Sequence, residues 1–222
     1  MPHPPLIAID GPAASGKGTI AKKLAKHFDF AHLDTGLLYR AVGVMVLMED
    51  KDPADAKAAE EAAKSFSHKN LERLKSEPLL RTDKASQAAS KVAAVPGVRA
   101  ALLKFQRDFA GKPPNGKKGA VLDGRDIGTI IAPEAPVKLY ITASLDARAE
   151  RRFKELQARG EHVTYAAVLA DMKERDGRDE KRATAPSKPA KDAVIIDTSN
   201  MTADETYAEA LNIAEDRLKK PG

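Results

Sequence analysis

The stretch that decides the fold is residues 6–19, Leu-Ile-Ala-Ile-Asp-Gly-Pro-Ala-Ala-Ser-Gly-Lys-Gly-Thr. The apolar run Leu6–Ile9 predicts a buried parallel strand, and residues 11–19 fit the G-x-x-x-x-G-K pattern that opens a helix. Glycines 11 and 16 allow backbone conformations closed to other residues, so successive N–H groups can point at phosphates. The stretch therefore predicts a phosphate-binding loop; the alternative is a Gly-rich turn with no ligand.

The residues around this loop suit the phosphates of a nucleotide. A helix starting near Lys17 presents its positive end to them, and the Lys17 ammonium can reach the β- and γ-phosphates as a point charge. Gly18 stands where Ser or Thr commonly follows the lysine, so the hydroxyl comes one residue later, at Thr19. The residues expected to bind the donor nucleotide here are Gly11, Pro12, Ala13, Ala14, Ser15, Gly16, Lys17, Gly18 and Thr19.

Length and composition fit one globular α/β core with one or two small insertions. The chain has 222 residues, of which 42% are apolar and only 5% aromatic, so aliphatic packing must dominate. Cysteine is absent, which excludes disulfides and thiolate metal sites. No apolar run approaches the roughly 20 residues of a membrane span, and the N-terminal segment is too short and Pro-rich for a signal peptide. We therefore expect a soluble cytoplasmic protein with no membrane partner.

The charge balance is basic, with a net charge of +5. Such a balance permits either nucleic acid or a small anionic substrate as partner. Residues 144–191 hold 12 Lys or Arg and 9 Asp or Glu, a mixture of signs unlike a continuous nucleic-acid-binding stripe. The distribution favours phosphate handling over nucleic acid, and nothing in it requires more than a monomer.

Apolar runs alternate with helical patterns along the chain. The predicted strands are Leu6–Ile9, Phe30–Leu33, Ala120–Asp123, Val137–Ala143 and Val194–Asp197. The predicted helices are Thr19–Phe28, Leu37–Met48, Ala85–Val95, Val98–Phe109, Leu145–Arg159, a helix starting at Tyr165, and Ala203–Lys219. This alternation predicts a parallel sheet covered on both faces. Residues 49–84 remain open between two exposed helices and a poorly ordered insertion.

Polar residues follow two of these strands. Asp34, Thr35 and Gly36 follow the second predicted strand, and a helix carrying Tyr39 and Arg40 comes next. Ligands of open α/β sheets bind at such carboxyl ends, so Arg40 is either an anion ligand or a solvated side chain.

Asp123 ends the third predicted strand and is followed by Gly124, Arg125 and Asp126. An Asp on the strand beside a phosphate loop can hold the magnesium shell, directly or through water. A simple Asp- and Gly-rich turn is the alternative.

The segment between the last two strands is rich in arginine. Arg148 and Arg152 are four residues apart and share a helix face. Farther along, Arg175, Arg178, Asp179 and Arg182 would share a face if the helix continues through Gly177. Either this is a solvated helix with pairs such as Arg175 with Asp179, or the crowded guanidinium groups bind an anion.

Five stretches together resemble bacterial-type cytidylate kinases of the P-loop nucleoside monophosphate kinase superfamily. They are residues 9–19, 33–40, 88–99 and 123–129, and residues 173–179 with Arg182. The resemblance implies a P-loop NTPase core with a five-stranded parallel sheet, a monophosphate-binding insertion and a lid. It places the core in residues 1–48, 111–144 and 186–222, the monophosphate-binding region in 49–110, and the lid in 145–185.

The resemblance also implies an ATP-dependent transfer of phosphate to CMP or dCMP, with Mg²⁺. Ser90, Arg99 and Asp126 would then read the cytosine edge. Arg40, Arg125 and Arg182 would hold the acceptor phosphate, and Arg175 with Asp179 the ribose. Thr35 and Tyr39 would complete the acceptor site, Arg148 and Arg152 would close over ATP, and Thr19 and Asp123 would hold the metal. The catalytic groups would be Lys17, Arg125, Arg175 and Arg182.

One segment departs from the family pattern. Residues 66–84 are shorter than the family's small β-sheet insertion and lack an alternating strand pattern, which predicts a trimmed or helical base-binding region. Selectivity among CMP, dCMP and UMP therefore stays open. The competing hypotheses are a P-loop kinase for another acceptor, such as UMP, AMP or shikimate, and a nucleotide-binding regulatory or nucleic-acid-binding protein.

Overall fold

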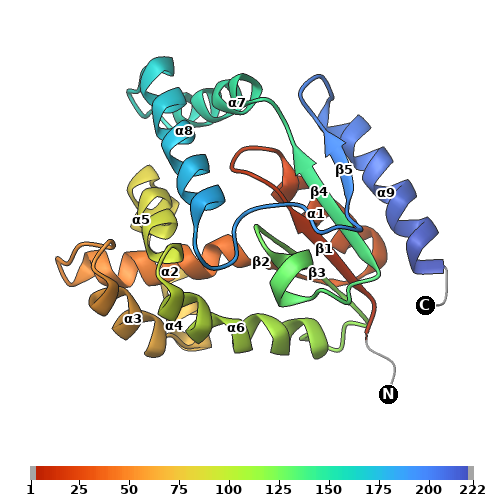
Figure 1. The fold of residues 1–222 in the computed structure, drawn as a ribbon, viewed down its shortest axis with the longest axis horizontal. Coiled ribbons are helices and arrows are strands. Elements are labelled where there is room, and N and C mark those ends of the chain that lie inside the picture. The colour runs from red at the N-terminus through yellow and green to blue at the C-terminus, as the bar shows by residue number, and fades with distance from the viewer. Residues whose placement is uncertain (1–3, 220–222) are drawn as a thin grey trace. The chain divides into compact units, whose positions relative to one another are not determined.

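The computed structural model describes residues 4–219 and contains one five-stranded sheet within them. Its strands are β1 (Leu6–Asp10), β2 (Ala31–Asp34), β3 (Ala120–Gly124), β4 (Val137–Thr142) and β5 (Val194–Asp197). The order is β2-β3-β1-β4-β5, with β1 parallel to both β3 and β4, and β4 parallel to β5 (Figure 1). All five predicted strands are confirmed, with their ends shifted by one residue at most.

Helices connect these strands. They are α1 (Lys17–Phe28), α2 (Thr35–Met48), α3 (Ala56–Lys64), α4 (His68–Lys75), α5 (Asp83–Ala93), α6 (Pro96–Gly111), α7 (Leu145–Ala158), α8 (Tyr165–Lys181) and α9 (Ala203–Lys219), with a 3₁₀ turn η1 (Pro78–Arg81) and a π-helical turn η2 (Ile127–Ile131). Four of them, α1, α2, α5 and α6, begin two residues earlier than predicted, and for α2 and α6 the N-terminal residues give the reason. Asp34 accepts the backbone N–H of Leu37 and so starts α2 at Thr35, and proline opens α6 at Pro96.

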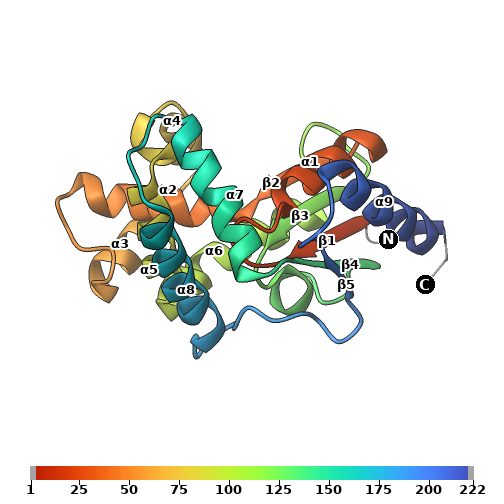
Figure 2. The same cartoon turned by 90° about the horizontal axis from the view of Figure 1, so that it is seen from above.

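The chain forms two compact units, one made of residues up to Leu33 and from Phe109 onward, the other of Asp34–Asp108. The first, which we call the core unit, contains nearly all of the sheet. Every residue of β1 and of β3 is buried, as expected for a parallel sheet with both faces covered. Helices α1 and α9 pack side by side on the sheet, where Ile20 and Leu24 of α1 join Ala210 of α9 in the main hydrophobic core (Figure 2).

The second unit is helical from Thr35 to Asp108. Helix α5 packs tightly on α2, since a Cβ atom at Gly43 would lie only 2.9 Å from the Ala88 side chain. Helix α4 starts with a capping box between Ser67 and Asn70 and buries Leu71. The open alternative for residues 49–84 is therefore resolved in favour of ordered helices, and no strand replaces the short segment 66–84.

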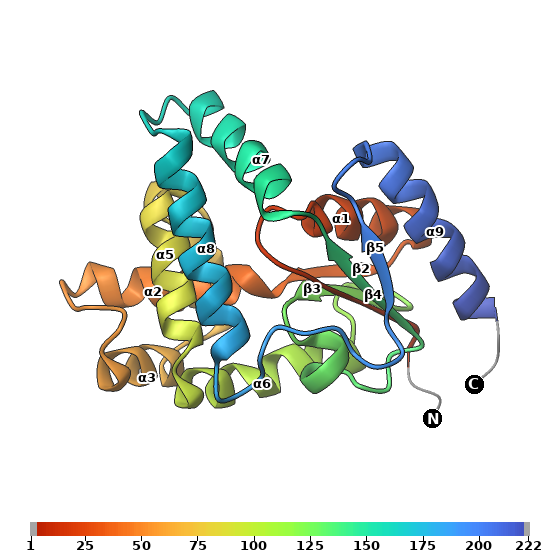
Figure 3. The same cartoon turned by 45° about the horizontal axis from the view of Figure 1, so that its top comes forward.

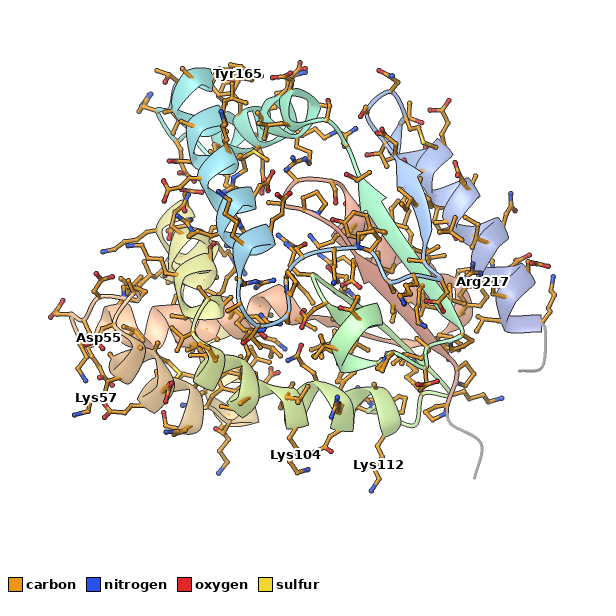
Figure 4. All side chains as sticks on the ribbon, in the orientation of Figure 1. Asp55, Lys57, Lys104, Lys112, Tyr165 and Arg217 are labelled. Carbon is orange, nitrogen blue, oxygen red and sulfur yellow. The ribbon has the colours of Figure 1, made fainter. Side chains whose placement is uncertain are left out.

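Helices α7 and α8 of the core unit form an antiparallel hairpin that follows β4 (Figure 3). The backbone turns at Gly160, whose φ is 77°, and Thr164 caps α8 by accepting the N–H of Ala167. Figure 4 shows Tyr165 at the start of α8, where its ring meets the edge of Phe153 on α7, with 6.1 Å between centroids. Helix α8 continues through Gly177 and ends at Lys181, so Arg175, Arg178 and Asp179 lie within it, whereas Arg182 follows it as the non-helical C-cap.

Within residues 4–219, no helix is both long and apolar enough to cross a bilayer.

Candidate active site

The predicted loop lies between β1 and α1. Gly11 has a φ of 150°, and a Cβ atom there would lie 2.0 Å from the carbonyl oxygen of Ile141, so no side chain fits. Gly16 is left-handed at the helix start, with a φ of 89°. The Lys17 ammonium donates to the carbonyl of Pro12 at 3.3 Å, which folds the lysine back across the loop. The backbone thus has the strand, loop and helix expected of a phosphate cradle.

Asp123 lies beside this loop because β3 is the neighbour of β1, with Ile9 paired to Asp123 in the register. Its carboxylate is 4% exposed, and Oδ1 lies 2.7 Å from Nε2 of His32 on β2. The other oxygen, Oδ2, lies 3.7 Å from where a Cβ atom of Gly18 would stand. The carboxylate therefore faces the start of α1, at ordinary contact distance from the position of Gly18.

This donor set suits Mg²⁺. A carboxylate such as that of Asp123 and a hydroxyl such as that of Thr19 on α1 are hard oxygen ligands, which this ion prefers. Across residues 4–219, no three His, Cys, Asp or Glu side chains are grouped as metal ligands. Sequence reasoning missed His32, whose only signal is its place one residue before the end of an apolar run.

Arginines gather around Asp179. The carboxylate Oδ2 lies 3.0 Å from Nε of Arg125, and both side chains are largely buried. Burial by itself raises the pKa of Asp179, but the charges of Arg125, Arg175 and Arg182 outweigh it and hold that pKa below its usual value. The ion pair between Arg125 and Asp179 thus joins α8 to the turn after β3, across 54 positions of sequence.

The fourth arginine of this segment, Arg178, behaves differently. It pairs with Glu174 one turn back on α8, in the manner of a solvated helix pair. Arg175 on α8 and Arg182 directly after the helix therefore concentrate positive charge around the buried carboxylate of Asp179. An anion is the partner that such crowding favours.

Arg148 has contacts within the core unit that hold the hairpin to the loop. Its Nε donates to the Ala143 carbonyl at 2.9 Å, NH1 donates to the Ala13 carbonyl at 3.4 Å, and NH2 pairs with Asp176 at 2.7 Å. Arg152 pairs with Glu155 on its own helix at 2.9 Å. The small apolar core of the hairpin also includes residues 13 and 14, so the loop and the hairpin are packed together.

In the second unit, the structure places the predicted residues on α2, α5 and α6. The Arg99 guanidinium lies 5.4 Å from the centre of the Tyr39 ring. Arg40 donates to the Leu80 carbonyl at 3.3 Å and to Oγ of Ser86 at 3.2 Å. Ser90 is 3% exposed on α5, and Thr35 is the first residue of α2. Ser86 was not predicted, and its contact with Arg40 comes from the tight packing of α5 on α2.

A cavity of about 150 Å³ lies beside the loop in the core unit. It is lined by Ser15, Gly16, Thr19, Ile20, Arg151, Thr198, Met201, Ala203 and Thr206. The Thr198 hydroxyl donates to the Ser15 carbonyl at 3.3 Å and accepts from NH1 of Arg151 at 2.9 Å. Sequence reasoning missed Arg151 and Thr198, although Thr198 directly follows the carboxyl end of β5, where ligands of such sheets bind.

A family model described as cytidylate kinase matches residues 7–216 of this chain. The chain belongs to the cytidylate kinase family. The match spans the loop, Asp123 and the arginines of α8. The cytidylate kinase of Paramagnetospirillum magneticum is 59% identical over 208 residues, covering 94% of this chain and 96% of that protein. That of Rhodospirillum rubrum is 55% identical over 215 residues, covering 97% and 99%.

A solved structure shares the fold. An uncharacterized protein from Eubacterium ventriosum matches with a TM-score of 0.51 at 18% identity, covering 95% of this chain and 98% of that one. At this identity, the likeness concerns the arrangement of the sheet and its helices alone.

Proposed function

We propose that the chain transfers the γ-phosphoryl group of ATP to CMP or dCMP, giving CDP or dCDP and ADP. The observation that carries this proposal is the family match over residues 7–216, which includes both the loop with Lys17 and the arginines around Asp179. The named relatives are cytidylate kinases at 55–59% identity over nearly their whole length.

The reaction needs little proton chemistry from the protein. The acceptor is a phosphate whose second pKa is about 6, so it is mostly dianionic at neutral pH and attacks without a general base. The requirement is positive charge around a γ-phosphoryl group flanked by anions, together with in-line placement. Lys17 and the backbone N–H groups of the loop would hold the donor phosphates, and Thr19 and Asp123 would hold Mg²⁺, directly or through water. When bound, that ion neutralises charge on the β- and γ-phosphates.

The arginines of the core unit are the proposed ligands of the acceptor. Arg125 and Arg182 would hold its phosphate, as would Arg40 of the second unit. Arg175 with Asp179 would hold the ribose, with Arg175 also stabilising charge during transfer. The lowered pKa of Asp179 supports this assignment, because it keeps the carboxylate ionised as a hydrogen-bond acceptor for sugar hydroxyls.

Ser90 and Arg99 of the second unit, with Asp126 of the core unit, are the proposed readers of the cytosine edge. Tyr39 would support Arg99 by the stacking already described, and Thr35 would complete the acceptor site. Because this unit is helical, we propose that selectivity between CMP, dCMP and UMP depends on residues of α5 and α6 in place of a small sheet.

The donor nucleoside is assigned to the cavity beside the loop. Its size suits part of a nucleoside, and Thr198 joins its wall to the loop through the Ser15 carbonyl.

We assign Arg148 and Arg152 to the lid, residues 145–185, that closes over ATP. Residues 49–110 are assigned to monophosphate binding and the remainder to the core. We further propose that the enzyme acts as a monomer in the cytoplasm, where its substrates are metabolites.

The deciding experiment measures ADP release from ATP and Mg²⁺ with each acceptor in turn: CMP, dCMP, UMP, AMP and shikimate. We expect rapid release with CMP and dCMP, and ATP hydrolysis without acceptor far below it, because a closed site excludes water. Faster release with any other acceptor would reassign the substrate. Salt-sensitive binding of RNA or DNA without acceptor-dependent ADP release would instead favour a nucleic-acid-binding protein.

A further inference from the structure

Asp10 is a buried carboxylate that the proposed reaction does not use. It is the last residue of β1, directly before Gly11 of the loop, and it is 3% exposed. Its Oδ1 accepts the backbone N–H of Ile127 at 2.8 Å, and its Oδ2 accepts that of Gly128 at 2.8 Å. These are the first two residues of the π-helical turn η2.

The two contacts replace an ordinary helix cap. The first N–H groups of a helical segment have no partner within it and normally bond to the residue just before the segment. Here that residue is Asp126, which makes no side-chain cap hydrogen bond. Asp10 supplies the cap from another strand, 117 and 118 positions away.

The charged surroundings of Asp10 come from the same turn. Burial raises the pKa of Asp10 to about 7, and the two N–H donors oppose this rise. Asp126 adds to the rise, whereas Arg125 opposes it. From the sheet, the aliphatic stem of Lys138 lies within 3.4 Å of where a Cβ atom of Gly128 would stand. The Asp10 carboxylate thus faces residues 125–128, the turn that follows β3.

We propose that Asp10 is a positioning residue for the acceptor: its two hydrogen bonds hold Arg125 and Asp126 in register with the phosphate loop. Asp10 and Gly11 are adjacent on the chain, so the strand that fixes the donor cradle also fixes this turn. The inference rests on the proposed function only for the roles of Arg125 and Asp126. The turn is π-helical, a rare geometry that is frequently found at functional sites.

Asp10→Asn tests the proposal because it keeps the shape but replaces one acceptor oxygen with an NH₂ donor. One of the two N–H groups then faces another donor, and the turn shifts. We expect the KM for CMP, and the Kd for CMP measured by calorimetry without ATP, to rise at least 10-fold, with the KM for ATP within twofold of wild type. A purely structural role would instead lower the amount of active enzyme and leave both KM values unchanged.

Asp55→Asn is the matched control. Asp55 also accepts two backbone N–H groups at a helix start, those of Lys57 at 2.9 Å and Ala58 at 3.4 Å, on the exposed end of α3 (Figure 4). This variant should leave the KM and Kd values for CMP unchanged. Unchanged CMP affinity in Asp10→Asn, or equal losses for CMP and ATP, would overturn the proposal.

A second measurement applies if Asp10→Asn does not fold. Hydrogen exchange on the wild-type protein should show the amides of Ile127 and Gly128 protected to the same degree as β1. Rapid exchange at these two amides would refute the contacts on which the proposal depends. This readout needs no turnover, so it separates a failure of the positioning role from a failure of the kinase assignment.

Discussion

Replacing Asp179 with Asn tests whether a single carboxylate balances the arginines of α8 and the turn after β3. At the observed 3.0 Å, two unit charges attract by about 5 kcal/mol at an effective dielectric constant of 20. Removing one partner of a buried ion pair costs about 3–5 kcal/mol. Asparagine keeps one oxygen for Arg125, so we expect a loss of about 3 kcal/mol in the free energy of unfolding. For a chain of this size, this lowers Tm by about 6–12 °C.

Urea unfolding at pH 7 measures this loss, and inorganic phosphate provides a second readout. Because the variant has excess positive charge, phosphate should stabilise it more than it stabilises the wild type. The pKa of Asp179 is lowered in the folded protein, so its contribution is present above the unfolded value of 3.8 and is lost as pH falls below it. The difference between variant and wild type should therefore shrink in acid.

Glu174→Gln is the control on the same helix. Its carboxylate pairs with Arg178 but is 70% exposed, so the loss should stay below about 0.5 kcal/mol. An Asp179→Asn loss of less than about 1 kcal/mol, or equal losses in the two variants, would refute the electrostatic account of this cluster.

Three further predictions concern the loop and the strand before it. Lys17→Ala should lower turnover on the order of 10²- to 10³-fold, by analogy with losing one hydrogen-bond donor to a developing charge. The free energy of unfolding, measured in urea, should change by less than about 0.5 kcal/mol. Near-normal ADP release by this variant would contradict the kinase mechanism. Gly11→Ala should destabilise the protein by about 3 kcal/mol or more, because its Cβ would lie 2.0 Å from the Ile141 carbonyl oxygen. The control is Gly160→Ala, where φ is 77° but the surrounding space is open, so the cost in the same urea assay should be only about 1 kcal/mol. Because the pKa of Asp10 is raised, folding favours its protonated form, and this contribution to stability is present below pH 3.8 and is lost as pH rises toward 7. Between pH 5 and 7, the free energy of unfolding of the wild type should fall by about 1.4 kcal/mol per pH unit relative to that of Asp10→Asn. Parallel plots of this free energy against pH would show that Asp10 does not titrate in this range.

Local features of the sequence were sufficient to predict the elements and the donor loop. The apolar runs that form β1 and β3 are short and bounded by proline, glycine or aspartate, so their positions follow from the local sequence alone. Gly11 and Gly16 of the loop and Gly160 after α7 have positive φ values. Glycine adopts such values more readily than other residues, so a glycine in the sequence predicted a change of backbone direction at these positions. At α9, the T-x-x-E pattern of Thr202 and Glu205 forms a capping box, with reciprocal contacts at 3.2 and 2.7 Å.

The pairings of the site could not be read locally. The arginine spacing on α8 predicted a common face, but it could not predict that Asp179 also pairs with Arg125, 54 positions earlier in the sequence. His32 meets Asp123 only because β2 lies beside β3, and Asp10 reaches η2 only because β1 lies beside β3.

Periodicity and turn residues report on contacts within a few positions, and they determined which segments became strands, helices and the phosphate loop of this protein. Strand order is set by how whole elements bury their apolar faces against one another, and many orders satisfy the same local pattern. Tertiary structure alone therefore decided which carboxylate meets which arginine, histidine or backbone N–H group.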